Sequence, residues 1–401
     1  MVLFFMNIKN INFGFVFQLV AILSLTIIYI FQWGVMITNP TLRTGTDFMA
    51  FYSAGRVAQE YGFSSAYNIA LQQEIQEEVV GFSLANGQVL LYNHLPYLIP
   101  ILSFAISKNY ITSFGIWATL MFLVYATSSF IFIKTTQRNK NDFIFLIGII
   151  LFFPFFQSLL LGQDTAILFL GATLWVIGIR QKKDWLTAIG VALTSVRPHL
   201  YLVFFVPLLF YNYRVVWKYI FITGTLALFS ILLIGWNGTL DFINILQISA
   251  GGTWYGMNEN AMFNLIGLIS RSLPFLELNF IRILGWVGYI ASILFLCFIW
   301  AKKEKSVSWL ISLTIILSLF FAPHLHYHDL TLLMIPLVIV GRQSKNTTNL
   351  ILGISLTLLL IKPLYYILPY VLYAGLLWCI VKRKKKPQIH EAGIREENEA
   401  W

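Results

Sequence analysis

Long runs of apolar residues recur along this chain and are separated by short polar segments. About 20 apolar residues are enough to cross the hydrocarbon core of a bilayer as a helix. The pattern therefore predicts an all-α polytopic membrane protein with about 11–13 transmembrane helices in a single domain over 1–381. The runs are 13–37, 111–133, 143–161, 165–180, 186–212, 218–235, 281–300, 307–322, 328–341 and, as a pair, 348–381.

Composition and the placement of charge support this interpretation. The chain has 58% hydrophobic and 11% charged residues, whereas about a quarter of the residues of a soluble domain are charged. Its formal net charge of +10 falls in short loops, which indicates the positive-inside rule rather than nucleic-acid binding. The basic clusters are Lys134/Arg138/Lys140, Arg180/Lys182/Lys183, Arg214/Lys218, Lys302/Lys303/Lys305, Arg342/Lys345 and Lys382 to Lys386.

These clusters predict the orientation in a cell membrane. We expect both termini to be cytoplasmic, with 382–401 as a charged, disordered tail. Two long segments, 38–92 and 236–280, are poor in Lys and Arg, so we expect them on the outer side. Two apolar stripes at helical spacing in the first segment predict two amphipathic helices on the outer membrane surface. The stripes are Phe48, Phe51, Tyr52, Gly55 and Ala58, then Leu71, Ile75, Val79 and Phe82.

Two apolar segments cannot both be complete crossings if all basic loops share one side. We expect 93–107 to be re-entrant or interfacial, and 186–212 to consist of two half-spans that meet near Arg197-Pro198. A proline disfavours helix at the residue before it. Broken helices at membrane depth are tolerated where they line a cavity.

Asp47 follows the first predicted span and begins an amphipathic stretch. With Thr46, it has the residue type of a helix N-cap, which would satisfy free backbone N–H groups. It could equally be a general base held at the level of the lipid headgroups. The pattern leaves both interpretations open.

Arg197 and His199 stand in the middle of an apolar run. Ionisable groups inside a membrane are energetically costly, which makes them candidates for function. A guanidinium can bind a phosphate through two hydrogen bonds. The alternative is a structural arginine that is ion-paired or extends to the interface.

The outer side also includes two short polar motifs. In 323–329, His324, His326, His328 and Asp329 could bind zinc, with His324 and His328 on one helix face. Contact with phosphate or sugar, without a metal, is the interpretation that we favour. In 161–165, Gln163 and Asp164 fit an ordinary turn.

All four polar motifs face outward in the predicted topology, which favours one shared site. The chain has no Walker-type phosphate loop, dinucleotide fingerprint or Ser-His-Asp spacing, which argues against ATP-driven, redox and hydrolase chemistry. Trp254, Tyr255, Asn258 and Glu259 in the second long loop are candidates for contact with a sugar.

At these motifs the chain resembles glycosyltransferase family 87, the polyprenyl-phosphate-mannose-dependent type with a GT-C fold. The likeness extends from about Gly45 to Asp329. It rests on Asp47-Phe48, Tyr52-Ser53-Ala54-Gly55-Arg56, Ala66-Tyr67-Asn68, Gly162-Gln163, Ala188 to Pro198, and Pro323-His324 with Tyr327 and Asp329. Arg197 replaces the usual lysine. Asn93-His94-Leu95-Pro96 and Asn260-Ala261-Met262 depart from the family pattern.

The resemblance implies an inverting hexosyltransferase that uses no cofactor or metal. It moves a mannose-like sugar from a polyprenyl-phosphate donor to a hydroxyl of a lipid-linked or glycan acceptor on the outer face. Asp47 would be the catalytic base, and Arg197, His324 and His326 would bind the donor phosphate. The implied substrate-binding residues are Tyr52, Arg56, Gln163, Asp164, His199, Asn260, His328 and Asp329.

Another class of protein also has broken helices and intramembrane charge. A transporter or flippase of a lipid-linked or anionic substrate is the alternative, although the sequence has no internal repeat. A non-catalytic membrane assembly protein is the third candidate, but it would not need polar groups on one side.

Overall fold

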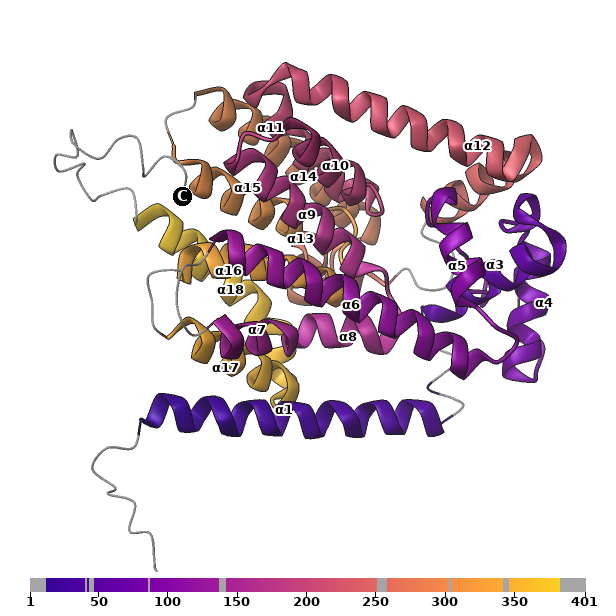
Figure 1. The fold of residues 1–401 in the computed structure, drawn as a ribbon, viewed down its shortest axis with the longest axis horizontal. Coiled ribbons are helices and arrows are strands. Elements are labelled where there is room, and N and C mark those ends of the chain that lie inside the picture. The colour runs from indigo at the N-terminus through magenta and orange to yellow at the C-terminus, as the bar shows by residue number, and fades with distance from the viewer. Residues whose placement is uncertain are drawn as a thin grey trace, which may run out of the picture.

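A computed structural model describes residues 12–39, 42, 47–85, 87–136, 142–250, 258–302, 305–341 and 346–382. Within these ranges the chain forms helices and no strand, and several long helices run side by side (Figure 1). Most of the predicted tail, several basic loop residues, Thr46, Trp254 and Tyr255 lie outside the described residues.

Five described helices are long and apolar enough to cross a membrane, and α7 with α8, bent by 49° at their junction, makes a sixth candidate. An all-α polytopic membrane protein is therefore confirmed. The five are α1 (Phe13–Thr38), α6 (Tyr110–Thr136), α12 (Tyr213–Ala250), α14 (Leu278–Lys302) and α18 (Lys362–Lys382).

Shorter helices complete the structure. Seven further apolar helices have 10–17 residues, less than the roughly 20 that a full crossing requires. The prediction of about 11–13 membrane helices counted most of them as spans or half-spans, but it expected 93–107 to be re-entrant or interfacial. The shorter α-helices are α3 (Phe48–Tyr61), α4 (Ile69–Val80), α5 (Ile99–Ala105), α7 (Asp142–Ile150), α8 (Phe153–Leu161), α9 (Thr165–Arg180), α10 (Asp184–Thr194), α11 (Pro198–Tyr211), α13 (Leu265–Ser272), α15 (Val307–Phe321), α16 (Met334–Gly341) and α17 (Thr347–Leu360); the 3-10 turns are η2 (Phe63–Ser65), η3 (Pro96–Leu98), η4 (Glu259–Ala261) and η5 (Tyr327–Leu333).

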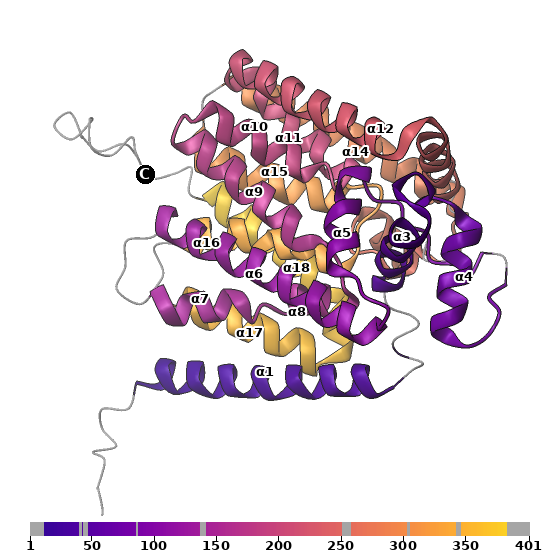
Figure 2. The same ribbon diagram turned by 45° about the vertical axis from the view of Figure 1, so that its right-hand side comes forward.

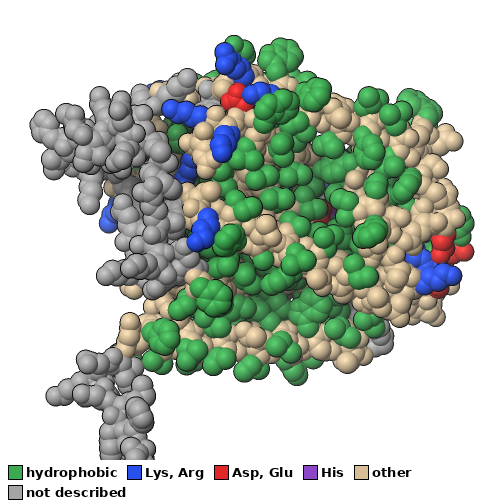
Figure 3. All heavy atoms as spheres, in the orientation of Figure 1, with side chains coloured by type: hydrophobic (Ala, Val, Ile, Leu, Met, Phe, Trp, Pro, Cys, Tyr) green, Lys and Arg blue, Asp and Glu red, His purple; other side chains and the backbone are tan. Residues whose placement is uncertain are grey.

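The two ends of the molecule differ in charge. The C-terminal ends of α6, α9 and α18 lie at one end, and α3, α4 and α5 form a group at the other (Figures 1 and 2). Most Lys and Arg side chains on the visible face gather at the first end, and a broad hydrophobic surface separates them from the second (Figure 3). We call the first the basic end and the second, which holds the cavity described below, the cavity end.

The predicted break inside 186–212 is confirmed. Helix α10 ends at Thr194 and α11 begins at Pro198, while Arg197 between them is extended at φ −123° and ψ 90°. The segment 93–107 forms η3 and α5, an apolar stretch of 10 residues, which is too short to cross and agrees with the expected incomplete crossing.

The two long loops contain helices, as was predicted for the first of them. Two helices occur in the first loop, but every residue of α3 from Phe48 to Ala58 is buried, so α3 packs inside the protein instead of lying on the membrane surface. In the second, α12 continues to Ala250 past a break at Gly235 (φ 67°), and α13 follows. The segment 236–280, predicted as an outer loop, therefore contains helices.

Candidate active site

A cavity of about 700 Å³ lies at the cavity end, within the size range of small-molecule sites. Its walls come from α3, the segment before η3, α11, α12, α14 and the segment before η5. Five of the six histidines of the chain line it, and the sixth, His390, lies outside the described residues. The polar lining includes Asp47, Asn93, His94, Gln163, Arg197, His199, Glu259, Arg282, His324, His326, His328 and Asp329.

The turn between α8 and α9 determines how α3 meets this cavity. Gly162 ends α8 at φ 71°, and a Cβ there would lie 2.4 Å from the Cβ of Phe48. Only glycine combines this backbone conformation with so close an approach. The Trp117 Nε1–H donates to the Gly162 carbonyl at 2.8 Å. The start of α3 therefore lies against Gln163 and Asp164.

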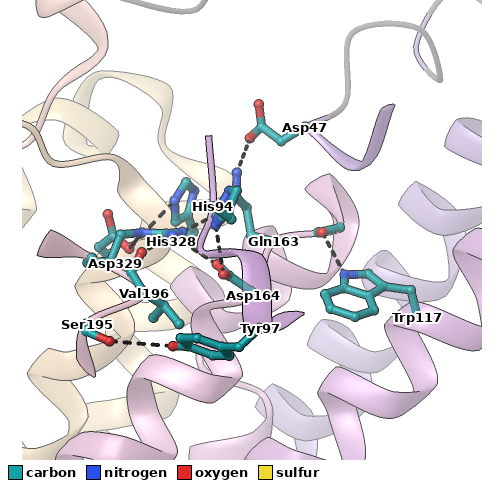
Figure 4. A network of polar contacts seen from close by, with 12 residues as sticks. Asp47, His94, Tyr97, Trp117, Gln163, Asp164, Ser195, Val196, His328 and Asp329 are labelled. Carbon is teal, nitrogen blue, oxygen red and sulfur yellow. Dashed lines mark hydrogen bonds and ion pairs between the residues drawn. The ribbon is translucent and has the colours of Figure 1, made fainter. Parts of the chain in front are cut away.

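A chain of hydrogen bonds leads from Asp47 into the protein (Figure 4). The Gln163 amide donates from Nε2 to Asp47 Oδ2 at 2.7 Å, and its Oε1 accepts from Arg197 Nη2 at 2.8 Å. Asp47 makes no side-chain bond that caps α3. The geometry thus favours a carboxylate held at the cavity over an N-cap.

Arg197 lies between two buried carboxylates. Its Nη1 is 2.9 Å from Asp164 Oδ1, and its Nε is 3.3 Å from Asp329 Oδ1. The backbone carbonyl of Val196 also accepts from Nη1 at 3.3 Å. Each guanidinium nitrogen therefore already has an acceptor from the protein, as expected for a buried cation.

Asp164 is fully buried, and its second oxygen is 3.0 Å from His94 Nδ1. Burial raises the pKa of Asp164, but Arg197 and His94 lower it more, so that the pKa is well below its usual range. Asp164 is ionised at neutral pH. It does not cap α9 through its side chain, so its role differs from that of an ordinary turn residue.

The histidine segment has a fixed shape. Asp329 Oδ2 accepts from the His326 backbone N–H at 3.4 Å, and Asp329 Oδ1 lies 3.7 Å from His328 Nε2. His324 precedes η5 in a non-helical segment, so His324 and His328 do not share a helix face as predicted. Among the described residues, no three His, Cys, Asp or Glu side chains are arranged to hold a metal ion.

Residues 95–323 match the family model described as glycosyltransferase family 87. The chain belongs to this family. The matched segment contains Gln163, Asp164, Arg197, Glu259 and Arg282, while Asp47 precedes it and the histidine segment largely follows it. Searches of curated proteins and of solved structures gave no match. The family favours a glycosyltransferase over a transporter.

The structure brings most of the predicted site residues of this glycosyltransferase together. Asp164 is buried behind the cavity wall, where it contacts Arg197, and three other residues lie outside the cavity. Tyr52 and Arg56 face away from it: the Tyr52 hydroxyl donates to the Lys108 carbonyl at 2.9 Å and accepts from Arg56 Nη1 at 3.0 Å, and Arg56 pairs with Glu60. The third residue is Asn260, whose Oδ1 accepts from the Ser270 hydroxyl at 2.6 Å. These side chains stabilise contacts between helices and turns.

Three residues that line the cavity were not in the catalytic or binding site predicted from the sequence: His94, Glu259 and Arg282. For Glu259 the sequence suggested only a contact with a sugar. His94 follows an apolar segment and carries no spacing signal of its own. Glu259 pairs with Arg282, whose Nε and Nη2 both donate to Glu259 Oε1 at 2.9 and 2.5 Å. Arg282 had no motif around it in the sequence, so only its contact with Glu259 at the cavity distinguishes it.

Proposed function

We propose that this glycosyltransferase moves a hexose, mannose-like, from a polyprenyl-phosphate sugar to a hydroxyl of a glycan or glycolipid acceptor, with inversion. The donor has a lipid tail and a polar sugar, so the site must bind an apolar chain and a polar group beside the catalytic residue. One cavity that joins a polar wall to an opening on the apolar surface carries this proposal.

The opening is indicated by hydrophobic side chains that line the cavity and are also exposed. Leu202 is 41% exposed, Leu246 38% and Trp286 51%. They belong to α11, α12 and α14, three helices with apolar outer faces. A prenyl chain that leaves the cavity here would enter the hydrocarbon core without exposing apolar surface to water.

Asp47 is suited to remove the acceptor proton. It lines the cavity, and its described partner is the neutral Gln163 amide, whereas Asp329 and Glu259 contact guanidinium groups. The acceptor oxygen gives its proton to Asp47 and forms a bond to the anomeric carbon. The bond from that carbon to the phosphate oxygen breaks, and the phosphate leaves with the electron pair. Attack opposite the leaving group inverts the configuration.

Arg197 positions this machinery. Its contacts with Gln163, Asp164 and Asp329 join the α8–α9 turn to η5, so Gln163 is held while it orients Asp47. A phosphate on Arg197 would have to displace these acceptors next to two carboxylates, which is electrostatically unfavourable.

The donor and Asp47 are tested by one assay. Purified enzyme is offered polyprenyl-phosphate hexoses, a nucleotide sugar and a set of acceptors. We expect transfer from the lipid phosphate, and a fall of roughly 10²–10⁴-fold for Asp47→Asn. Asp184→Asn, at the basic end, is the matched control because it also removes a carboxylate charge and should transfer normally. Full activity of Asp47→Asn would exclude the base, and transfer from the nucleotide sugar alone would exclude the donor.

The orientation is a separate part of the proposal. The cavity end faces outward, and both termini are cytoplasmic, because most Lys and Arg side chains on the visible face gather at the opposite end. In a background without Cys297 and Cys379, Asn93→Cys should react with an impermeant reagent from outside, and Lys182→Cys only from inside. The reverse labelling would refute this orientation.

A further inference from the structure

Two arginines line the cavity, and their surroundings differ. Arg197 contacts two carboxylates, a carbonyl and an amide oxygen, and its side chain is 9% exposed. Arg282 contacts one carboxylate, that of Glu259, and its side chain is 31% exposed. Of these two cations, Arg282 is the one that a soluble or lipid-borne anion can reach.

The contact between Arg282 and Glu259 uses one oxygen. Both Nε and Nη2 donate to Oε1, so the pair lacks the two parallel bonds to two oxygens that make arginine–carboxylate pairs strongest. The phosphodiester of a polyprenyl-phosphate sugar has two unesterified oxygens, and the monoester that remains after transfer has three. Either group can accept the two donors at separate atoms. Exchange of Glu259 for phosphate therefore improves the geometry around Arg282.

The position of Arg282 on α14 adds a direction. Arg282, Trp286 and Tyr289 follow one another at spacings of four and three residues on the face that lines the cavity. Trp286 is half-exposed, and the Tyr289 hydroxyl donates to the His199 carbonyl at 2.5 Å. A cation thus lies one helical turn from the apolar opening, an arrangement that fits an amphiphile with an anionic head.

We infer that Arg282 binds the phosphate of the lipid-borne substrate and that Glu259 occupies this place in the free protein until the phosphate displaces it. This inference rests on the proposed function and assigns the phosphate contact to Arg282 instead of Arg197. Glu259 then keeps Arg282 oriented toward the cavity and disfavours binding of weaker anions.

Direct binding tests this inference without any transfer. Detergent-purified protein is titrated with farnesyl phosphate, farnesol and inorganic phosphate by calorimetry. Wild type should bind farnesyl phosphate, and Arg282→Gln should weaken that binding by roughly 10–100-fold, because hydrogen bonds between charged groups are lost. Binding of farnesol should remain unchanged, which also shows that the variant is folded.

Glu259→Gln provides the opposite result. It removes the competing carboxylate, so farnesyl phosphate should bind several-fold more tightly than to wild type. The controls are Lys218→Gln and Asp184→Asn, because the Lys218–Asp184 pair is similarly exposed (27% and 17%, against 31% and 11%) and lies at the basic end. Both controls should bind farnesyl phosphate like wild type.

Several outcomes would overturn the inference: no binding of farnesyl phosphate by wild type, equal binding by Arg282→Gln, or weaker binding by Glu259→Gln. Tighter binding of inorganic phosphate than of farnesyl phosphate would show that Arg282 binds a free anion. It would overturn the inference that the ligand is lipid-borne. Loss of binding in Arg282→Gln, with no sugar transfer from any polyprenyl-phosphate donor by wild type, would refute the proposed function and leave the phosphate site in place.

Discussion

Ion pairs lie near both ends of helix α10, and the two sets have different environments. At the basic end, Asp184 lies 2.8 Å from Lys218, and both side chains are partly exposed. At the cavity end, Arg197 lies between Asp164 and Asp329, and all three are buried. Burial of charge costs several kcal/mol per ion unless partners compensate. Of the two sets, the one beside the cavity carries this cost, which indicates that its buried charges serve the site.

The largest difference between the two regions should appear when the cation is removed. Arg197→Met removes the arginine that two buried carboxylates share, and we expect a loss of about 3–5 kcal/mol in the free energy of unfolding. Lys218→Met removes a partly exposed pair and should cost about 0–1 kcal/mol. Unfolding monitored by tryptophan fluorescence in detergent measures both. Equal losses would remove the distinction between the two sites.

Partial rescue sharpens this result. Asp329→Asn added to Arg197→Met removes one of the two buried charges that shared this arginine and should recover part of the loss, while Asp184→Asn added to Lys218→Met should change little. If the double variant at the cavity end is no more stable than Arg197→Met, the cost does not arise from these charges.

The next largest effect is expected when glycine is replaced by alanine at Gly162, beside the cavity, and at Gly224, within α12. Gly162→Ala places a Cβ 2.4 Å from Phe48 and requires φ near 71°, at about 1–2 kcal/mol for the backbone alone. The displaced start of α3 should move Asp47 and lower transfer by roughly 100-fold. Gly224→Ala, where nothing lies within 4 Å, should stabilise α12 slightly, by up to about 1 kcal/mol. An activity assay measures this effect. Normal transfer by Gly162→Ala would show that this turn does not position Asp47.

The two ends should also differ in their response to acid. Burial, with His326 and His199 nearby, lowers the pKa of His324 well below 6.5, so the folded state keeps this ring neutral where the unfolded state binds a proton. Stability should therefore fall as pH decreases below about 6.5, by up to about 1.4 kcal/mol per pH unit for this group.

His324→Gln isolates that contribution. Its unfolding midpoint should change less between pH 7.5 and 5.5 than that of wild type, while Lys218→Met should keep the wild-type difference. An unchanged acid sensitivity in His324→Gln would show that the ring is protonated in the folded protein.

Local sequence signals predicted the helices and the break, and tertiary contacts determined the rest. Pro198 restricts its neighbour Arg197 whatever surrounds it, so the break could be predicted. The pairing of Arg197 with Asp164 depends on the packing of α9 against α10, where a Cβ on Gly190 would lie 2.3 Å from the Trp175 backbone. A turn motif contains no sign of that approach, so Asp164 had the pattern of an ordinary turn residue.

The smallest effect concerns residues near the cavity that do not line it. The resemblance assigned Tyr52 to substrate binding, but its hydroxyl joins α3 to the Lys108 carbonyl and to Arg56. Tyr52→Phe should therefore cost about 1 kcal/mol of stability and leave the KM for donor and acceptor unchanged. Steady-state kinetics beside unfolding curves separate the two roles. A raised KM without lost stability would place Tyr52 at the substrate, and the site would then have to include more of α3 than the residues that line the cavity. The same stability loss with unchanged KM would limit the site to the cavity lining, because a structural contact acts equally on free and substrate-bound protein.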